Sequence, residues 1–124
     1  MNTDVKLKWI AALRSGEYKQ GNGKLRTEDN KYCCLGVLSD LYNKETGKGQ
    51  WLEDDGNAYS FKTNESVYSS SLCTLDVMKW AGIDSSACFV DGLDPKIYRA
   101  RTLAYLNDNG TSFKEIAKII EKHL

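Results

Sequence analysis

The feature that most constrains the fold is an amphipathic helix predicted at the C-terminal end of the sequence. Ser112 and Glu115 form a capping box, in which two side chains satisfy free N–H groups at the start of a helix. An apolar stripe follows at helical spacing and consists of Ile116, Ile119, Ile120 and Leu124. The last helix is therefore predicted to start at Ser112, and we expect its stripe to pack on a core.

The chain is long enough for one such core. Its 124 residues fit a single domain, with an expected compact radius of roughly 14 Å. A chain of this size buries roughly two-thirds of its unfolded surface. Leu, Ile, Val and Phe account for 27 of the residues, a share just above the level below which chains stay disordered. We therefore expect residues 1–124 to form one compact domain with a modest core.

Other helices are predicted by apolar residues at a spacing of three and four. The first runs from about Thr3 to Ser15, with a cap at Asn2 or Thr3 and a left-handed exit at Gly16. The others cover residues 35–42, 74–80 and 98–107, and residues 43–50 are expected to be a polar loop. The core residues expected from the helix at 74–80 and the residues just before it are Leu72, Leu75, Met78 and Trp80. Those expected from the helix at 98–107 are Leu103 and Leu106.

One glycine lies inside a predicted helix. Gly36 interrupts the apolar run from Leu35 to Leu38, where glycine costs about 1 kcal/mol relative to alanine. Its presence indicates close packing or a ligand near the backbone.

Short strands are predicted between the helices. Residues 18–20 and 24–26 flank Gly21–Asn22–Gly23, which indicates a β-hairpin or a glycine-rich loop. Residues 51–52 and 58–61 flank an acidic turn, and residues 88–90 form another candidate strand. The expected fold class is α+β, with four to five short helices and a small antiparallel sheet or hairpins.

The cysteines are expected to be reduced thiols. Adjacent cysteines such as Cys33 and Cys34 seldom pair with each other, the first residues form no secretory signal, and nothing else indicates export. Cys73 and Cys88 lack the paired spacing of zinc ligands, and the single histidine, His123, is next to last. We therefore expect a cytoplasmic protein with no metal site.

Catalytic motifs and membrane segments are missing from the sequence. A terminal His123 is a poor general base, so Ser-His or Cys-His chemistry is not expected. No glycine-rich nucleotide motif occurs, no cofactor is expected, and no run of 18 apolar residues predicts a membrane span. Carboxylate chemistry stays open because Glu53, Asp54 and Asp55 could hold Mg²⁺, but a solvated acidic turn before Gly56 is the favoured interpretation.

Charge is unevenly distributed although the formal net charge is zero. Residues 1–26 and 95–124 carry an excess of basic side chains, whereas residues 51–94 are acidic. If the two ends converge, a basic face results that can attract a small anion. The zero net charge removes the simplest case for general nucleic-acid binding. The alternative is that these charges are scattered and solvated, which would give the same numbers of basic and acidic residues in each segment.

The segment from Arg14 to Arg26 has the composition of a ligand-binding loop. Glycines let a ligand approach the backbone, arginine grips phosphate with two hydrogen bonds, and tyrosine stacks on a base. The candidate ligand-binding residues are Arg14, Tyr18, Gln20, Lys24 and Arg26, with Arg99 and Arg101 added if the ends lie together. An exposed hairpin explains the same residues. A domain this small offers few deep pockets, so we expect the site at a homo-oligomer interface.

Residues 110–117 are similar to part of a helix-turn-helix motif. The sequence ends at Leu124 without a further recognition helix, so we expect no sequence-specific DNA binding and interpret the segment as a helical hairpin on the core.

Three motifs carry a family resemblance: W-x-x-A-L-R-S-G-x-Y-x-Q-G at residues 9–21, Y-C-C-L-G-V-L-x-D-L at 32–41 and L-x-x-L-N-D-x-G-x-S-F-x-E-I-A at 103–117. Together they resemble a family of small phage and prophage proteins. The resemblance covers both ends of the chain and leaves about residues 43–95 unmatched. The resemblance implies a phage gene product in a bacterial cytoplasm. It implies no activity and no site residues.

Three functional hypotheses follow. The first is a non-enzymatic binding protein that counters host defence by sequestering a small, anionic, nucleotide-derived signal. The second is an inhibitor that binds a host enzyme through the acidic segment. The third is a small hydrolase that uses carboxylates.

Overall fold

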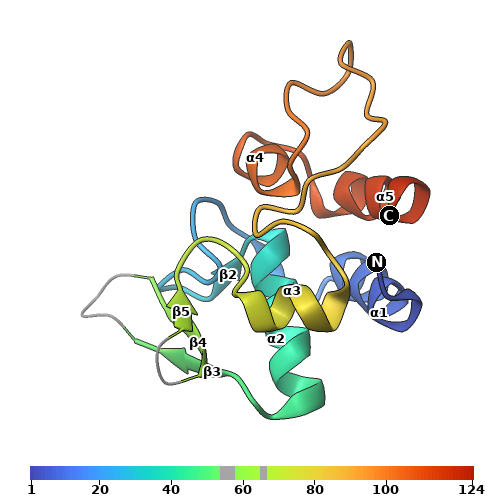
Figure 1. The fold of residues 1–124 in the computed structure, drawn as a ribbon. Coiled ribbons are helices and arrows are strands. Elements are labelled where there is room, and N and C mark those ends of the chain that lie inside the picture. The colour runs from blue at the N-terminus through green and yellow to red at the C-terminus, as the bar shows by residue number, and fades with distance from the viewer. Residues whose placement is uncertain (54–57, 65–66) are drawn as a thin grey trace.

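Helix α2 (Cys34–Thr46) lies at the centre of the fold, and its first two turns are almost completely buried. The computed structural model describes residues 1–53, 58–64 and 67–124. The other helices in this part of the chain are α1 (Thr3–Arg14), α3 (Leu75–Ala81), α4 (Leu103–Asp108) and α5 (Phe113–His123). Helices α1 and α5 pack together on one side of α2, α3 covers a second side, and α4 lies beside α5 (Figure 1).

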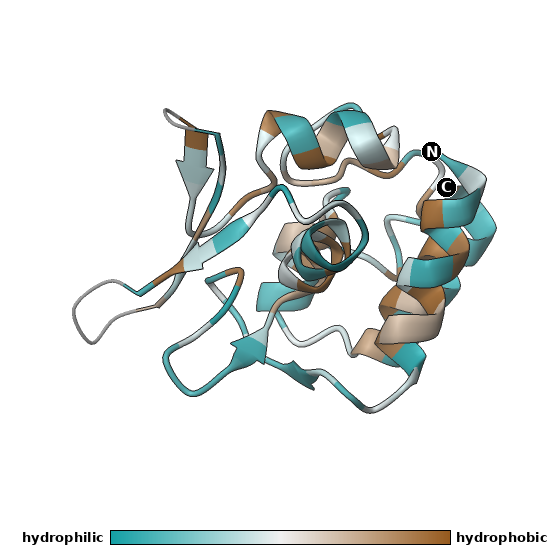
Figure 2. Ribbon diagram, turned by 90° about the horizontal axis from the view of Figure 1, so that it is seen from below, coloured by the Kyte–Doolittle hydropathy of each residue, from teal (hydrophilic) through white to brown (hydrophobic). Residues whose placement is uncertain are grey.

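Two small sheets complete the α+β fold that the sequence predicts. Strands β3 (Gln50–Leu52), β4 (Ser60–Asn64) and β5 (Val67–Ser69) form an antiparallel sheet, with Trp51 opposite Phe61. Strands β1 (Lys19–Gln20) and β2 (Lys31–Tyr32) form a parallel pair. The three-stranded sheet lies on the side of α2 opposite α1 and α5 (Figures 1 and 2).

Local capping signals determine where the terminal helices begin. The Asn2 side chain accepts a hydrogen bond from the Val5 N–H at 3.1 Å, and the Ser112 hydroxyl accepts one from the Glu115 N–H at 3.2 Å. The stripe of α5 is buried at Ile116, Ile119 and Ile120. Helices α1 and α5 pack against each other, and Figure 2 shows hydrophobic positions along both ribbons. The predicted start of α5 and its packing on the core are confirmed.

The predicted hairpin around Gly21–Gly23 is wrong, and the alternative of a glycine-rich loop is correct. β1 pairs in parallel with β2, and Arg26 instead forms an antiparallel bridge with Tyr32. The tight turn lies at Thr27–Asn30, where Asn30 adopts a left-handed conformation with φ 61°. Asparagine tolerates that conformation better than other non-glycine residues.

Several predicted boundaries also need correction. Helix α2 runs on to Thr46 through part of the predicted polar loop. Helix α4 begins only at Leu103, because Thr102 supplies its N-cap and residues 98–101 are irregular. In the predicted strand at 88–90, only Phe89 forms a bridge, with Thr102.

The core prediction holds for α4 and fails in part for α3. Leu103 and Leu106 are buried, whereas Leu72 and Leu75 are exposed. Helix α3 has only seven residues and carries apolar side chains on most of its circumference. The side that is buried is the one formed by Val77 and Ala81, one turn apart.

Gly36 is explained by close packing. A side chain at this position would overlap the carbonyl oxygen of Leu25 and come within 2.6 Å of its carbonyl carbon. Leu25 itself is completely buried, and its N–H donates to the Ser70 carbonyl at 2.8 Å. The glycine therefore lets the 21–32 loop lie directly on α2.

Candidate functional site

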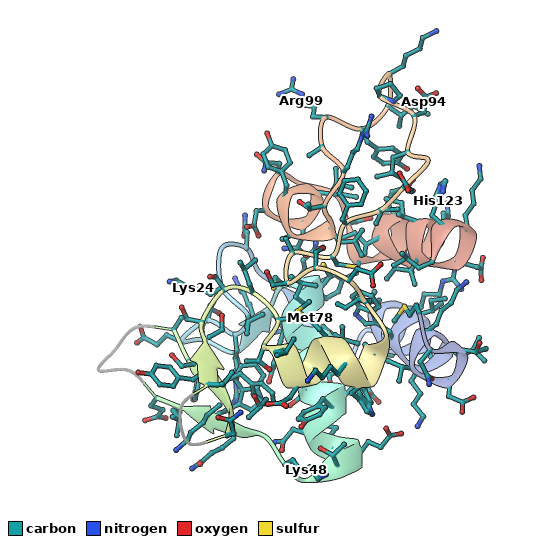
Figure 3. All side chains as sticks on the ribbon, viewed as in Figure 1. Lys24, Lys48, Met78, Asp94, Arg99 and His123 are labelled. Atoms are coloured by element: carbon teal, nitrogen blue, oxygen red, sulfur yellow. The ribbon has the colours of Figure 1, made fainter. Side chains whose placement is uncertain are left out.

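The structure brings only part of the predicted ligand-binding set together. Arg14 lies at the end of α1 and forms an exposed ion pair with Glu121, with Nη1 and Oε2 3.3 Å apart. Lys24 and Arg99 are both exposed and lie at well-separated places on the molecule (Figure 3). Arg101 is exposed on the segment that precedes α4. The ends of the chain converge through α1 and α5, but Arg99 does not reach Lys24.

Gln20 belongs to the internal framework of the fold. Its Nε2 donates to the Asn107 side chain at 2.9 Å and to the Thr111 carbonyl at 2.8 Å. Its Oε1 accepts a hydrogen bond from the Phe113 N–H at 3.0 Å. Because both the nitrogen and the oxygen of its amide form these hydrogen bonds, Gln20 connects β1 to α4, to the turn after it and to the start of α5.

Arg26 lies in a cluster of polar and aromatic side chains at the surface. Its guanidinium carbon is 4.1 Å from the ring centre of Tyr59 and 5.6 Å from those of Tyr32 and Trp51. Contacts at this distance are attractive because the negative ring face meets a positive charge. We call Arg26, Asn30, Tyr32, Trp51 and Tyr59 the Arg26 cluster.

The turn after Arg26 holds its side chain in place. The Asn30 Oδ1 accepts hydrogen bonds from Nε and Nη2 of Arg26, at 3.0 and 2.7 Å. The Arg26 carbonyl accepts one from the Tyr59 N–H at 2.9 Å, which joins the loop to the residues before β4. The cation is therefore fixed by neutral groups on two sides.

Arg26 has no counter-ion among residues 1–53, 58–64 and 67–124. Its hydrogen bonds in that part of the chain go to Asn30, and Nη1 makes none there. The residue is only partly buried. A fixed guanidinium with an unused donor edge at the surface can bind an anion, and phosphate matches its planar fork.

Tyr18 lies beside this cluster in a second hydrogen-bonded group. Its hydroxyl donates to Asp40 at 2.6 Å and accepts from Lys44 at 3.0 Å. Burial, followed by the hydrogen bond to Asp40, raises the pKa of Tyr18 to about 12. Asp40 also accepts from the Trp51 indole N–H at 3.0 Å. Tyr18 is therefore a protonated phenol that cannot act as a base near neutral pH.

Edge-to-face ring contacts connect the two groups. The ring centres are 5.0 Å apart for Tyr18 and Tyr32, 6.1 Å for Tyr32 and Trp51, and 6.5 Å for Trp51 and Tyr59. Such arrangements are favourable because positive ring edges meet negative faces. The four rings form a continuous, partly exposed row, and three of them, Tyr32, Trp51 and Tyr59, lie around the guanidinium of Arg26.

The cysteines are buried, free thiols, as the sequence predicts. Burial raises the pKa of Cys33 to about 11 and that of Cys88 to about 12. The pKa values of Cys34 and Cys73 are also raised well above the ordinary value by burial. Because the thiolate is the nucleophile, these residues are unreactive near neutral pH.

The other sequence hypotheses find little geometric support. In the described ranges, no group of three or more His, Cys, Asp or Glu side chains is placed to hold a metal ion. Asp54 and Asp55 of the proposed acidic turn lie outside the described residues. Glu53 accepts a hydrogen bond from the Tyr59 hydroxyl next to the three-stranded sheet, whereas Asp91 and Asp94 belong to the loop before α4, so these three carboxylates do not lie together (Figure 1).

Asn30, Tyr32, Trp51 and Tyr59 were not among the residues that the sequence predicts for the site. Local sequence carries one signal for Asn30, since asparagine in a polar turn favours a left-handed backbone. The three rings come from β2, β3 and the residue before β4. Their meeting depends on long-range pairing, which sequence spacing does not reveal.

Comparison with known proteins assigns the chain to one family. Residues 1–124 match DUF8296, a domain of unknown function, and the chain belongs to that family. No curated protein and no solved structure matches the chain significantly. No helix in the described part is both long and apolar enough to cross a membrane.

Proposed function

We propose that this protein is a non-catalytic binding protein that holds a phosphate-bearing, nucleotide-like ligand at the Arg26 cluster. The observation that carries the proposal is the guanidinium of Arg26, which is fixed by Asn30 and Tyr59 and lacks a described counter-ion. A phosphate would supply the missing negative charge and would use the donor edge that Asn30 leaves open.

The surrounding rings favour a nucleotide over inorganic phosphate alone. Tyr32, Trp51 and Tyr59 are partly exposed next to the cation, and a base that stacks on an aromatic ring gains roughly 1–3 kcal/mol. A phosphate contact and a stacked base a few ångströms apart are the two elements of nucleotide recognition.

The chemistry of the neighbouring groups supports binding without turnover. Tyr18 stays protonated, the thiols are buried, and His123 lies on α5 beside Gly92, away from the cluster. In the phage setting implied by the sequence motifs, the proposed role is sequestration of a nucleotide-derived signal in the bacterial cytoplasm, which would counter host defence.

The test is calorimetry with a panel of cyclic dinucleotides and ADP-ribose-type nucleotides, followed by heating and analysis of the released compound. We expect the nucleotide to be recovered unchanged. Arg26→Ala should weaken binding about ten- to hundred-fold, because a charge-assisted hydrogen bond contributes roughly 1.5–3 kcal/mol. Tyr59→Leu should weaken it as well, through loss of stacking.

Arg14→Ala is the matched control, since it removes the same charge from an exposed ion pair outside the cluster. It should bind like the wild type. Unaltered affinity in both Arg26→Ala and Tyr59→Leu would remove the cluster from the site. A chemically changed nucleotide would overturn the non-catalytic part of the proposal.

A further inference from the structure

Residues 91–100 form a loop that projects from the body of the protein next to α4 and α5 (Figure 1). A hydrogen bond of 2.6 Å from the Val90 N–H to the Arg101 carbonyl closes its base. Inside the loop, the Asp94 carbonyl accepts from the N–H groups of Ile97 and Tyr98, at 3.0 and 2.9 Å. Loops of this length with closed ends are compact Ω-loops, which frequently carry function.

Side-chain contacts anchor the loop to the domain. Leu93 is buried, and the Tyr98 hydroxyl donates to the Glu115 carboxylate of α5 at 2.7 Å. The loop is thus an ordered projection whose shape is determined before any partner arrives. Such preorganisation lowers the entropy cost of association.

The projection presents apolar side chains to solvent. Ile97 is 69% exposed, and Tyr105 on α4 is 44% exposed. Complete burial of one such aliphatic side chain is favourable by roughly 1.5–3 kcal/mol. Both residues line a hollow of about 200 Å³, together with Arg99 and Leu106.

A second hollow borders the same projection. It has a volume of about 320 Å³ and is formed by the loop and α5. Ile97 and Tyr98 line this hollow as well as the first one. The exposed Ile97 therefore borders two depressions, so one patch of surface contains both a protruding apolar side chain and the spaces that could receive one.

The charges on this patch are also of both signs. Asp94 and Glu115 line the larger hollow together with Lys118 and Lys122. Glu115 is held within its own chain by the Tyr98 hydroxyl and by Lys118, whose Nζ lies 3.9 Å from Oε2. Asp94 and Lys122 form no ion pair in the described part of the chain, so they are the charges that can pair across an interface. In a two-fold symmetric interface the same patch meets itself, so each feature must find its complement on that patch. An apolar protrusion beside hollows, with Asp94 and Lys122 on the rim of the same hollow, meets this requirement.

We propose that the loop face, consisting of residues 91–100, Tyr105 and the exposed side of α5 at Lys118 and Lys122, binds a second copy of this chain as a symmetric homodimer. Ile97 of each protomer enters a hollow of its partner, and Asp94 of one copy faces Lys122 of the other. The dimer does not depend on the nucleotide proposed above, because the Arg26 cluster lies elsewhere on the surface.

The proposal is tested by sedimentation equilibrium on the full chain across a range of protein concentrations. The wild type should reach a mass near twice the 13.9 kDa of one chain. Ile97→Asp places a charge in the apolar contact and should raise the dimer Kd at least a hundred-fold. Tyr105→Glu should do the same independently. Circular dichroism should show that both variants are folded, because both side chains are solvent-exposed.

Leu7→Asp is the matched control, since Leu7 is 61% exposed on α1, outside the loop face. It should dimerise like the wild type. A wild type that remains monomeric at all concentrations would overturn the proposal. So would a dimer that survives both Ile97→Asp and Tyr105→Glu, or one that is broken by Leu7→Asp and by neither of them.

Discussion

Replacing Gly36 by alanine tests how tightly the 21–32 loop is seated on α2. Helix propensity alone favours the change, since alanine is about 1 kcal/mol better than glycine in a helix interior. Packing opposes it. The added Cβ would overlap the carbonyl oxygen of Leu25 and lie 2.6 Å from its carbonyl carbon and 3.0 Å from its Cα.

These atoms belong to a backbone segment that cannot move cheaply. Leu25 is completely buried and donates to the Ser70 carbonyl. Overpacking in a core costs about 1–3 kcal/mol when side chains can adjust. Displacing Leu25 would add the loss of a hydrogen bond, about 1 kcal/mol, and part of its burial, about 1.5–3 kcal/mol. After the gain in propensity, we expect Gly36→Ala to cost about 3 kcal/mol.

Urea unfolding measures this cost directly. With a slope of about 1–3 kcal/mol per molar urea, the midpoint should fall by roughly 1–3 M. Gly16→Ala is the control, because nothing lies within 4 Å of its Cβ although φ is +78°. That variant should lose only about 1 kcal/mol, the strain of a left-handed alanine. Equal costs for the two variants, or stabilisation by Gly36→Ala, would refute the packing argument.

Further predictions concern α5 and the thiols. Ser112→Ala should cost about 1 kcal/mol through the lost cap, and Ile120→Ala about 2–5 kcal/mol through the lost packing of a buried side chain. Similar costs in thermal unfolding would mean that α5 is not packed on the core. A thiol reagent should count four cysteines in denatured, unreduced protein and react slowly with the folded protein at pH 8, since burial raises all four pKa values. Fewer than four thiols after denaturation would contradict the reduced state.

Helix ends could be predicted because their signals are local. The caps at Asn2 and Ser112 depend on one side chain and an N–H group three residues later, which the sequence displays directly. The inward side of α3 could not be predicted in the same way. Leu75 and Val77 are similar in hydrophobicity, and the position of α2 decides which of them is buried.

The candidate site was predictable only in part for the same reason. Arg26 and Tyr18 stand in a segment whose composition indicates a ligand, and both lie at or beside the cluster. Gln20 lies in the same segment, but its side chain stabilises the fold, because its amide forms hydrogen bonds with Asn107 and with the Phe113 N–H at the start of α5. Composition identifies residues capable of polar contacts, while burial decides whether those contacts are made inside the protein.

The internal hydrogen bonds of the loop also explain how Arg26 is held in a fixed position. At one end of the loop, the buried Asn107 donates to the Gly21 carbonyl at 2.8 Å and accepts from the Cys34 N–H at 3.1 Å. At the other end, Leu25 lies in the space that Gly36 leaves on α2. Because both ends of the loop are bound to α2 and α4, the guanidinium of Arg26 would lose little further freedom on binding the proposed anion. The affinity proposed for the Arg26 cluster thus depends on the same buried contacts that stabilise the fold.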